Sequence, residues 1–290
     1  MISIVIVSKD EESLDSTLEQ VRGQARDLAE PSEIVVVDAS AGRLRRIQQR
    51  HANDVQWLDF EAPAGVGVSI PHQRNVGVCT ATGEVIVFTD AGCRPEPGWL
   101  RRLVAPLWDG EEVTVGRTTG VGGNASPYNM QFEPGQDLYL RECPTINLAF
   151  RRRAFTAVGG FDEGFAYGSD VDFSWRLRDA GYRLRWVPDA VVGHDWGSHR
   201  RQLRRAYLYG RARARLYRKH RSRLKSVLRD DPIIVVYPLF LLGLPITLIA
   251  PFYPLLLLIP AWRNRSCGGL RSVADHLLFG LGALAEVLRL

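Results

Sequence analysis

Three short β-branched runs constrain the fold of this chain more than any other feature. They are "ISIVIVS" at 2–8, "EIVVVDAS" at 33–40 and "VIVFTD" at 85–90. Apolar residues recur at helical spacing at 12–29, and helices are also expected at 42–52 and at 73–84. Strands that alternate with helices in this way are typical of a parallel α/β sheet. The sequence therefore predicts an α/β fold with a mostly parallel, Rossmann-like sheet flanked by helices.

The pattern is less regular beyond residue 110. Residues 115–129, "VGRTTGVGGNASPYN", have the composition of a mobile loop. A strand is expected at 145–152, a helix at about 170–180 and a further strand in "YRLRWVP". The catalytic part of the chain is expected to end near residue 198.

A strongly basic segment follows at 200–229. It holds 13 lysines and arginines and no acidic residue, so the formal net charge of +5 becomes −8 without it. Apolar and small residues recur through it at helical spacing, which predicts an amphipathic helical segment at 199–231. Such a concentration of positive charge calls for an anion close by.

The next segment, 232–262, is uncharged over 31 residues. A membrane-spanning helix needs about 20 apolar residues, but prolines at 238, 245, 251, 254 and 260 interrupt this run. We expect either a kinked span or a re-entrant or in-plane helical hairpin. Residues 273–290 are expected to form another amphipathic or membrane-surface helix.

Two aspartates lie where strands of the expected sheet end, which is where parallel α/β sheets bind their ligands. Asp38 is suited to accept hydrogen bonds from a nucleobase or ribose, with a helix N-cap as the alternative. Asp90 is suited to hold a divalent cation that bridges a diphosphate, because Mg²⁺ needs few protein ligands. A turn-capping role is the alternative for Asp90.

Asp170 and Asp172 open the helix expected at 170–180, where the helix dipole favours carboxylates. They are two residues apart and so point in different directions. Arg176 lies four residues after Asp172, which predicts a structural pair and leaves Asp170 to face the cleft as a general base. His194 follows a strand, and a lone histidine is more often a surface or packed residue than a ligand.

Taken together, four stretches resemble the family 2 glycosyltransferases, which are inverting, nucleotide-sugar-dependent enzymes of GT-A fold. They are "SIVIVSKDEES", "EIVVVDAS", "QRNVGVCTATGEVIVFTDAGCRPEPGWL" and "TINLAFRRRAFTAVGGFDEGFAYGSDVDFSWRLRDAGYRLRWVPDAVVGH". They occur in the family's order over about residues 2–196. The resemblance implies a nucleoside-diphosphate-sugar donor and a divalent metal, Mn²⁺ or Mg²⁺. It also implies these roles: Asp170 as catalytic base; Ser8, Asp10, Asp38, Arg74 and Asn75 in nucleotide binding; Asp90 and His194 at the metal.

The chain departs from the family's pattern at two places. The second carboxylate of the metal-binding DxD is replaced by Gly92, and the Glu that precedes the catalytic Asp is replaced by Ser169. The residues that the resemblance makes central, Asp90 and Asp170, remain. The mechanism implied is a single displacement, in which Asp170 deprotonates an acceptor hydroxyl that attacks the anomeric carbon with inversion.

The tail suggests where such an enzyme works. Thirteen cationic side chains beside a long apolar run fit the cytosolic face of an anionic membrane better than nucleic acid, and no nucleic-acid partner is expected. The four scattered cysteines have no CxxC pair, which suits reduced thiols. We therefore expect a cell-membrane protein with its catalytic domain, 1–198, on the cytoplasmic side, hydrophobic membrane-associated helices at 232–290, and a lipid-linked or glycan acceptor.

Two other functions fit parts of the sequence. A sugar-phosphate nucleotidyltransferase shares a similar nucleotide-binding layout, but it needs a glycine-rich basic loop after the first strand, where this chain has the acidic "SKDEESLDS". A non-catalytic nucleotide-sugar-binding protein fits the two lost carboxylates. The sequence leaves open the sugar, the nucleotide, the acceptor and the linkage.

Overall fold

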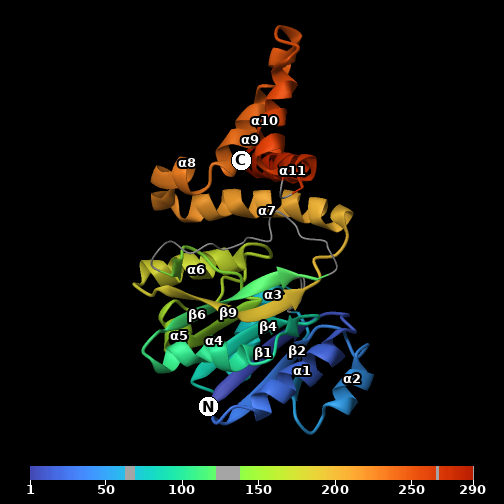
Figure 1. The fold of residues 1–290 in the computed structure, drawn as a ribbon, viewed down its shortest axis with the longest axis vertical. Helices are drawn as coiled ribbons and strands as arrows, with labels where there is room; N and C mark the ends of the chain where they lie inside the picture. The colour runs from blue at the N-terminus through green and yellow to red at the C-terminus, as the bar shows by residue number, and fades with distance from the viewer. Residues whose placement is uncertain (63–68, 122–137, 266–267, 290) are drawn as a thin grey trace. The chain divides into compact units, whose positions relative to one another are not determined.

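A computed structural model describes residues 1–62, 69–121, 138–265 and 268–289 (Figure 1). The described residues form two compact units. The first contains the residues up to Val121 and those from β7 to Asp195, and the second runs from Trp196 onward.

The first unit is built on a sheet in which the described residues contribute nine strands. Eight follow the order β3-β2-β1-β4-β8-β6-β9-β5, and β7 pairs with β9. The strands are β1 (Ile2–Ser8), β2 (Ser32–Asp38), β3 (Gln56–Asp59), β4 (Val85–Asp90), β5 (Arg94–Pro95), β6 (Val113–Gly120), β7 (Tyr139–Leu140), β8 (Asn147–Arg151) and β9 (Leu184–His194).

The strand directions refine the expectation of a mostly parallel sheet by adding reversed strands. β1 is parallel to β2 and β4, and β2 is parallel to β3. However, β8 runs antiparallel to both of its neighbours, β4 and β6, and β5 and β7 are antiparallel to β9. β6 and β9 are parallel to each other as well. The sheet is therefore mixed: β1, β2, β3, β4, β6 and β9 run in one direction, and β8 and the short strands β5 and β7 run in the other.

Both faces of this sheet are covered by helices, which explains the nearly continuous apolar runs. In β1 the side chains alternate: Ile2, Ile4 and Ile6 pack on one face, and Val5 and Val7 on the other. The first face is covered by α1 (Leu14–Arg26) and α4 (Trp99–Trp108), and the second by α3 (Ile70–Thr80), α5 (Arg152–Ala157) and α6 (Ser169–Asp179).

Two expectations for the first unit need correction. Residues 115–120, expected in a loop, lie in β6, whose first half is buried because Val113 and Val115 enter the core. The helix expected at 42–52 shortens to α2 (Arg45–Arg50). The rest of the expected loop, 122–129, lies outside the described residues.

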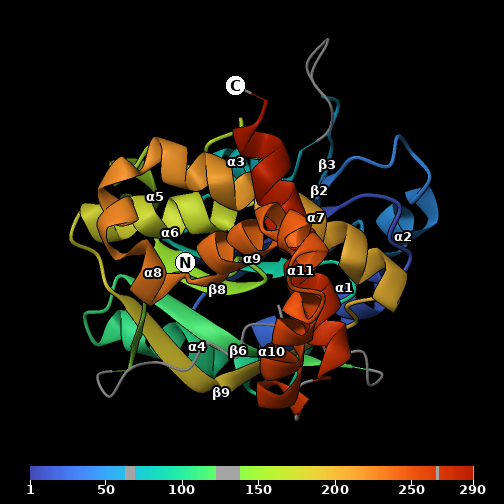
Figure 2. The same ribbon diagram turned by 90° about the horizontal axis from the view of Figure 1, so that it is seen from above.

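The second unit is helical (Figure 2). The basic segment forms α7 (His199–Lys219), η1 (Arg221–Ser226) and α8 (Val227–Asp230), and the chain ends in α11 (Leu270–Val287). α7 and α11 approach closely because glycines lie at their contact. A Cβ added at Gly210 would lie 1.9 Å from the carbonyl oxygen of Phe279, and one added at Gly282 would lie 2.0 Å from that of Tyr207.

Between these helices the uncharged segment forms a hairpin of short pieces: α9 (Ile233–Leu242), η2 (Leu244–Leu248), η3 (Tyr253–Leu257) and α10 (Leu258–Arg263). Its two arms are held together where the rings of Phe240 and Tyr253 stack with centroids 4.9 Å apart and the Tyr253 hydroxyl donates to the Phe240 carbonyl at 3.0 Å. The turn between the arms is exposed, with Leu248 89% and Ile249 90% accessible. In the described part of the chain, no helix combines the length and the apolar character needed to cross a membrane.

Candidate active site

The carboxyl ends of β1 and β2 bring Ser8 and Asp38 side by side, as direct partners in the parallel register. Asp38 is 1% exposed, and its Oδ1 accepts hydrogen bonds from the backbone N–H and the hydroxyl of Ser40. Burial raises the pKa of the Asp38 carboxyl, and these two hydrogen bonds oppose the rise. The buried Ser8 hydroxyl has no hydrogen-bond partner among the described residues, so it is available to a ligand at this edge.

Asp10 lies in the loop directly after β1, with a left-handed φ of 57°. Its backbone N–H donates to the Ser40 hydroxyl at 2.7 Å, which ties the loop after β1 to the loop after β2. Its half-exposed carboxylate accepts from Arg43 Nε at 2.6 Å, and this hydrogen bond lowers the pKa of Asp10. The structure thus brings three of the nucleotide-binding candidates, Ser8, Asp10 and Asp38, to one edge of the sheet.

Gln73, which sequence reasoning missed, fixes the geometry of that edge. Its side-chain amide is 2% exposed and donates to the Ser8 carbonyl at 2.9 Å and to the Val37 carbonyl at 3.0 Å. One α3 side chain therefore clamps the ends of two strands. The local sequence carries no signal for this contact, because the partners lie 65 and 36 residues away in the chain.

Arg74 and Asp90 form an ion pair at the end of β4. The distance from Arg74 Nη2 to Asp90 Oδ1 is 3.1 Å, and the exposed fractions of the two side chains are 6% and 30%. The guanidinium also lies 5.8 Å from the ring centroids of Phe88 and Phe161. Its Nε has no hydrogen-bond partner among the described residues. Arg74 is thus a buried cation with one unused donor beside the candidate metal ligand.

Asp170 occupies the first turn of α6, which begins after Gly168 at a left-handed φ of 78°. The carboxylate accepts from the N–H of Val171 at 2.9 Å. Burial raises the pKa of Asp170, and the charge of Arg74 is the largest opposing influence. Arg74 therefore interacts with both candidate catalytic carboxylates, Asp90 through a direct ion pair and Asp170 through its charge.

Asp172 has the structural role that its spacing predicted. It is fully buried, and its Oδ2 accepts from Arg176 Nε at 2.7 Å. The difference between Asp170 and Asp172 follows from their separation by two positions on a helix, which places their side chains in different surroundings.

Asn75 is a clamp in this structure. Its Nδ2 donates to the Phe161 carbonyl and to the Glu163 carboxylate, each at 2.9 Å, and its Oδ1 accepts from the N–H of Phe161 at 2.9 Å. These bonds fasten the turn before α6 to α3, next to Arg74. A contact between Asn75 and a nucleotide stays a prediction.

His194 ends β9, and its Nδ1 lies 3.7 Å from the Sγ of Cys93, a residue that follows Asp90 by three positions. Burial raises the pKa of the Cys93 thiol to about 12, so this thiol stays neutral near pH 7. Within residues 1–62, 69–121, 138–265 and 268–289, no group of three or more His, Cys, Asp or Glu side chains is placed to hold a metal ion together. The role of His194 at a metal stays a prediction.

The backbone at Gly92 explains why no side chain stands at the position of the second DxD carboxylate. Gly92 has a φ of +86°, which side chains rarely adopt, and a Cβ there would lie 2.9 Å from the hydroxyl of Ser13. Its N–H donates to Thr17 Oγ1 at 3.1 Å, which fixes the turn onto α1. The turn after Asp90 is therefore built for glycine.

Substituting Gly92 by alanine should lower the free energy of unfolding by about 1–2 kcal/mol through backbone strain, with a further loss from the contact with Ser13. Gly110→Ala is the matched control, because Gly110 also has a left-handed φ, +101°, but no atom within 4 Å of its Cβ position. Urea unfolding of both variants and of Gly92→Ala/Ser13→Ala measures the difference. Equal losses at 92 and 110 would show that Ser13 exerts no steric pressure.

Comparison with known proteins identifies the family. The family model described as "Glycosyl transferase family 2" matches residues 3–167, and the model described as "Glycosyl transferase family group 2" matches residues 142–264. The first match contains the ends of β1, β2 and β4 and the turn before α6.

Two curated relatives are glycosyltransferases by name. The chain is 31% identical over 188 residues to the pre-mycofactocin glycosyltransferase of Mycobacterium tuberculosis, a match that covers 59% of this chain and 39% of that relative. It is 22% identical over 238 residues to glycosyltransferase AglE of Haloferax volcanii, covering 78% of this chain and 77% of the relative. The chain thus spans about two fifths of the length of the first of these relatives.

Solved structures share the fold. The mannosyltransferase PcManGT of Pyrobaculum calidifontis, in complex with GDP-Man and Mn²⁺, has a TM-score of 0.66 and 19% identity, with 98% of this chain and 86% of that chain covered. TarS 1–349 of S. aureus with UDP-GlcNAc has a TM-score of 0.54 and 16% identity, with 98% and 91% covered. With the family 2 description matching more than half of its residues, the chain belongs to glycosyltransferase family 2.

Proposed function

We propose that this protein is an inverting glycosyltransferase that transfers a sugar from a nucleoside-diphosphate sugar to a hydroxyl of a lipid-linked or glycan acceptor at the cytoplasmic face of the cell membrane. The observation that carries the proposal is the group formed by Asp90, Arg74 and Asp170 at the carboxyl end of β4 and the start of α6. The family match favours glycosyl transfer over the nucleotidyltransferase alternative.

Each residue of this group has a task in a single displacement. Asp170 takes the proton of the acceptor hydroxyl while the oxygen attacks the anomeric carbon, and the nucleoside diphosphate leaves from the opposite side. The raised pKa of Asp170 makes it a stronger base than an ordinary aspartate. The unused Nε donor of Arg74 is suited to an anion, such as the diphosphate whose charge grows during departure. Ser8 and Asp38 hold the nucleoside.

The residues at the end of β4 fit a metal ion that binds together with the donor diphosphate. They fit less well an ion that the protein holds by itself. Asp90 offers one partly exposed carboxylate, and Arg74 donates to one of its oxygens. Mg²⁺ is commonly held through one or two carboxylates together with substrate phosphates. Asp90 would hold the ion, with His194 as a second candidate, and the ion would supply charge neutralisation for the diphosphate.

Donor binding provides the direct test. A thermal-shift screen of UDP-, GDP- and dTDP-sugars is expected to find one donor that stabilises the protein, by about 2.7 kcal/mol at a hundredfold excess over Kd. The shift should be larger with Mn²⁺, because the ion is held jointly by Asp90 and the diphosphate. If no donor shifts Tm with or without Mn²⁺, nucleotide-sugar binding is refuted.

The second candidate function is a non-catalytic nucleotide-sugar-binding protein. It is favoured by the loss of the carboxylates whose positions Gly92 and Ser169 occupy. A turnover assay distinguishes it from an enzyme. Donor hydrolysis or transfer is compared between the native protein and Asp170→Asn. Turnover that only the native protein shows supports the enzyme, and donor binding without turnover in both supports the binder.

Membrane association is proposed for the second unit. Its hairpin exposes large apolar side chains, among them Leu239, Leu248, Ile249, Phe252 and Trp262, which are between 61% and 90% accessible. Contiguous apolar surface of this kind marks an interaction site. The arginines of α7 supply the charge that attracts an anionic leaflet.

Adding charge at the hairpin turn should therefore release the protein from vesicles. Ile249→Asp/Phe252→Asp is expected to lower the bound fraction on anionic vesicles by at least about tenfold, because each side chain loses its apolar burial and gains a repelled carboxylate. Flotation of the full-length protein measures it. Ile249→Leu/Phe252→Leu, which keeps the turn apolar, should float like the native protein; equal flotation of the aspartate variant would rule the hairpin out as the anchor.

A further inference from the structure

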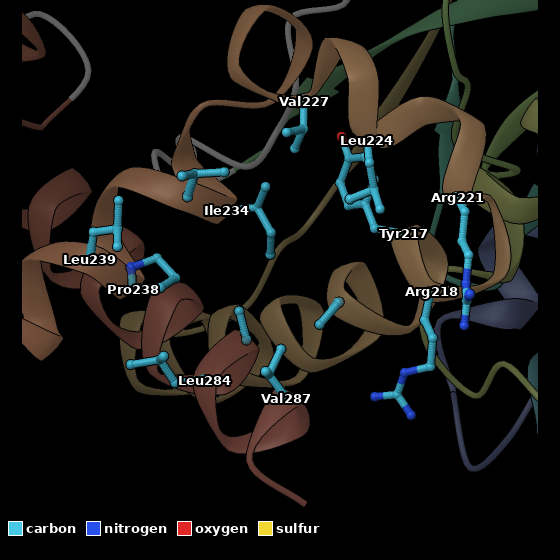
Figure 3. Close-up of a pocket in the computed structure, with 13 residues that line it drawn as sticks. Tyr217, Arg218, Arg221, Leu224, Val227, Ile234, Pro238, Leu239, Leu284 and Val287 are labelled. Carbon is cyan, nitrogen blue, oxygen red and sulfur yellow. The ribbon is translucent and has the colours of Figure 1, made fainter. Parts of the chain in front are cut away.

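A cavity of about 480 Å³ lies within the second unit (Figure 3). α7, η1, α8, α9 and α11 all contribute to its wall, and the lining side chains are Ala214, Tyr217, Arg218, Arg221, Leu224, Val227, Ile234, Val235, Pro238, Leu239, Ala283, Leu284 and Val287. Its volume is in the range of ligand-binding pockets. None of the catalytic candidates lines it.

The cavity has an apolar body and a charged end. Figure 3 shows Ile234, Pro238, Leu239, Leu284 and Val287 around its interior, and Arg218 and Arg221 together at one end. Apart from the two arginines and the Tyr217 hydroxyl, the lining is apolar. A ligand that fits has an apolar part next to an anionic group.

Neither of these two arginines forms a short ion pair with a carboxylate of the described part of the unit, although Arg218 donates to the Glu286 carbonyl at 3.3 Å. Glu286 accepts from Arg211 at 2.9 Å and from Arg215 at 2.7 Å, while Arg218 approaches it only to 3.9 Å. Arg221 is exposed and has no ion pair or hydrogen bond among the described residues. The charged end of the cavity therefore retains a capacity for an outside anion.

The apolar surface of the hairpin connects directly to this cavity. Leu239 lines the cavity and is 61% exposed, and Val236 and Leu242, on the same helix, are 53% and 59% exposed. A molecule held at this apolar surface of α9 therefore lies beside the apolar lining of the cavity, to which Leu239 belongs. This continuity favours a membrane lipid over a water-soluble ligand.

We propose that the cavity binds one acyl chain of an anionic phospholipid, with the lipid phosphate on Arg218 and Arg221. The proposal rests on the membrane association proposed above and deepens it, because docking then depends on a particular headgroup charge as well as on apolar burial. The hairpin turn provides general insertion, and the cavity provides selection among lipids.

The test uses the full-length protein and vesicles that contain a trace of phosphatidylglycerol or phosphatidylcholine with a photoreactive group in the acyl chain. Cross-linked peptides are mapped by mass spectrometry. We expect labelling within residues 214–239 and 283–287, about fivefold stronger with phosphatidylglycerol, as one cation at an anionic surface predicts. Equal labelling by the two lipids, or none at these residues, overturns the proposal.

Two variants locate the effect. Ala214→Phe fills the cavity and should abolish labelling there while flotation on vesicles persists. Arg221→Gln should remove the preference for phosphatidylglycerol, whereas Arg204→Gln, the same charge change at an exposed position of α7 outside the cavity, should keep it. If Ala214→Phe is labelled normally, the acyl chain does not occupy the cavity and the proposal is overturned.

The outcomes separate this proposal from the ones before it. Asp170→Asn should be labelled like the native protein, so a failure of catalysis leaves the lipid result intact. If membrane association itself fails, the native protein does not float. If only the cavity proposal fails, the protein floats and the label appears elsewhere.

Discussion

Asp170→Asn should lower kcat for sugar transfer by about 10²–10⁴-fold, the range that general acid–base residues contribute. The asparagine keeps the size of the side chain and an acceptor for the Val171 N–H, but it has no basic oxygen to take the hydroxyl proton. KM for the donor should change little, because the proposed nucleoside site lies elsewhere, at Ser8 and Asp38. Asp179→Asn, an exposed change of the same charge on α6, serves as the control and should retain activity.

The pH profile gives this prediction a second readout. The proposed mechanism requires ionised Asp170, whose pKa lies above its ordinary value of 3.8 because of burial. The activity of the native protein should therefore fall as the pH is lowered through that raised pKa, whereas the residual activity of Asp170→Asn should lack this limb. Near-normal transfer by the variant would show that another group is the base.

Asp90→Ala should be the second most damaging change and should lower the rate of transfer by about 10²–10³-fold. Removing one group that stabilises the charge developing in a transition state typically has an effect of this size. It removes the ligand proposed for the metal and also leaves the buried Arg74 without its partner, so stability should fall by about 3 kcal/mol.

Asp90→Asn separates these two effects, because its amide oxygen still accepts from Arg74 while its charge is lost. Transfer measured across a Mn²⁺ titration should be low in both variants, but the alanine variant, which also loses the hydrogen bond to Arg74, should unfold at a lower denaturant concentration than the asparagine variant. Asp109→Asn, an exposed aspartate after α4, should resemble the native protein in both assays. Near-normal transfer by Asp90→Ala would mean that the site works without a metal at Asp90.

The strand ends that carry the site could be predicted from the sequence because they depend on a local pattern. Ser8, Asp38 and Asp90 each end a β-branched run, and parallel register then places Ser8 beside Asp38. The Asp172–Arg176 pair also follows from local spacing, at i and i+4. These features need no knowledge of contacts between distant residues.

Other parts of the site depend on contacts that local patterns do not contain. β6 carries Gly and Thr in its second half and looks like a loop, yet its pairing with β9 makes it a strand. In β9, Pro188 and Asp189 fall at a register irregularity, after which the strand resumes and carries His194 to its end. The clamps made by Gln73 and Asn75 likewise join residues far apart in the chain.

The basic segment shows the same limit. Its charge predicts self-repulsion that only an outside anion relieves, but the structure pairs Arg211 and Arg215 with Glu286 of α11. Arg213 similarly pairs with Asp231. The positive charge that remains to attract a membrane is therefore smaller than the composition suggests, and it is concentrated in fewer side chains.

The glycine contact between α7 and α11 also has a topological consequence. Because Gly210 and Gly282 bring the two helix backbones together, the chain that leaves α7 must return to the same place before α11 begins. If the hairpin between them enters a bilayer, the chain must leave that bilayer through the same leaflet. Both helices then share one aqueous compartment, whatever depth the hairpin turn reaches.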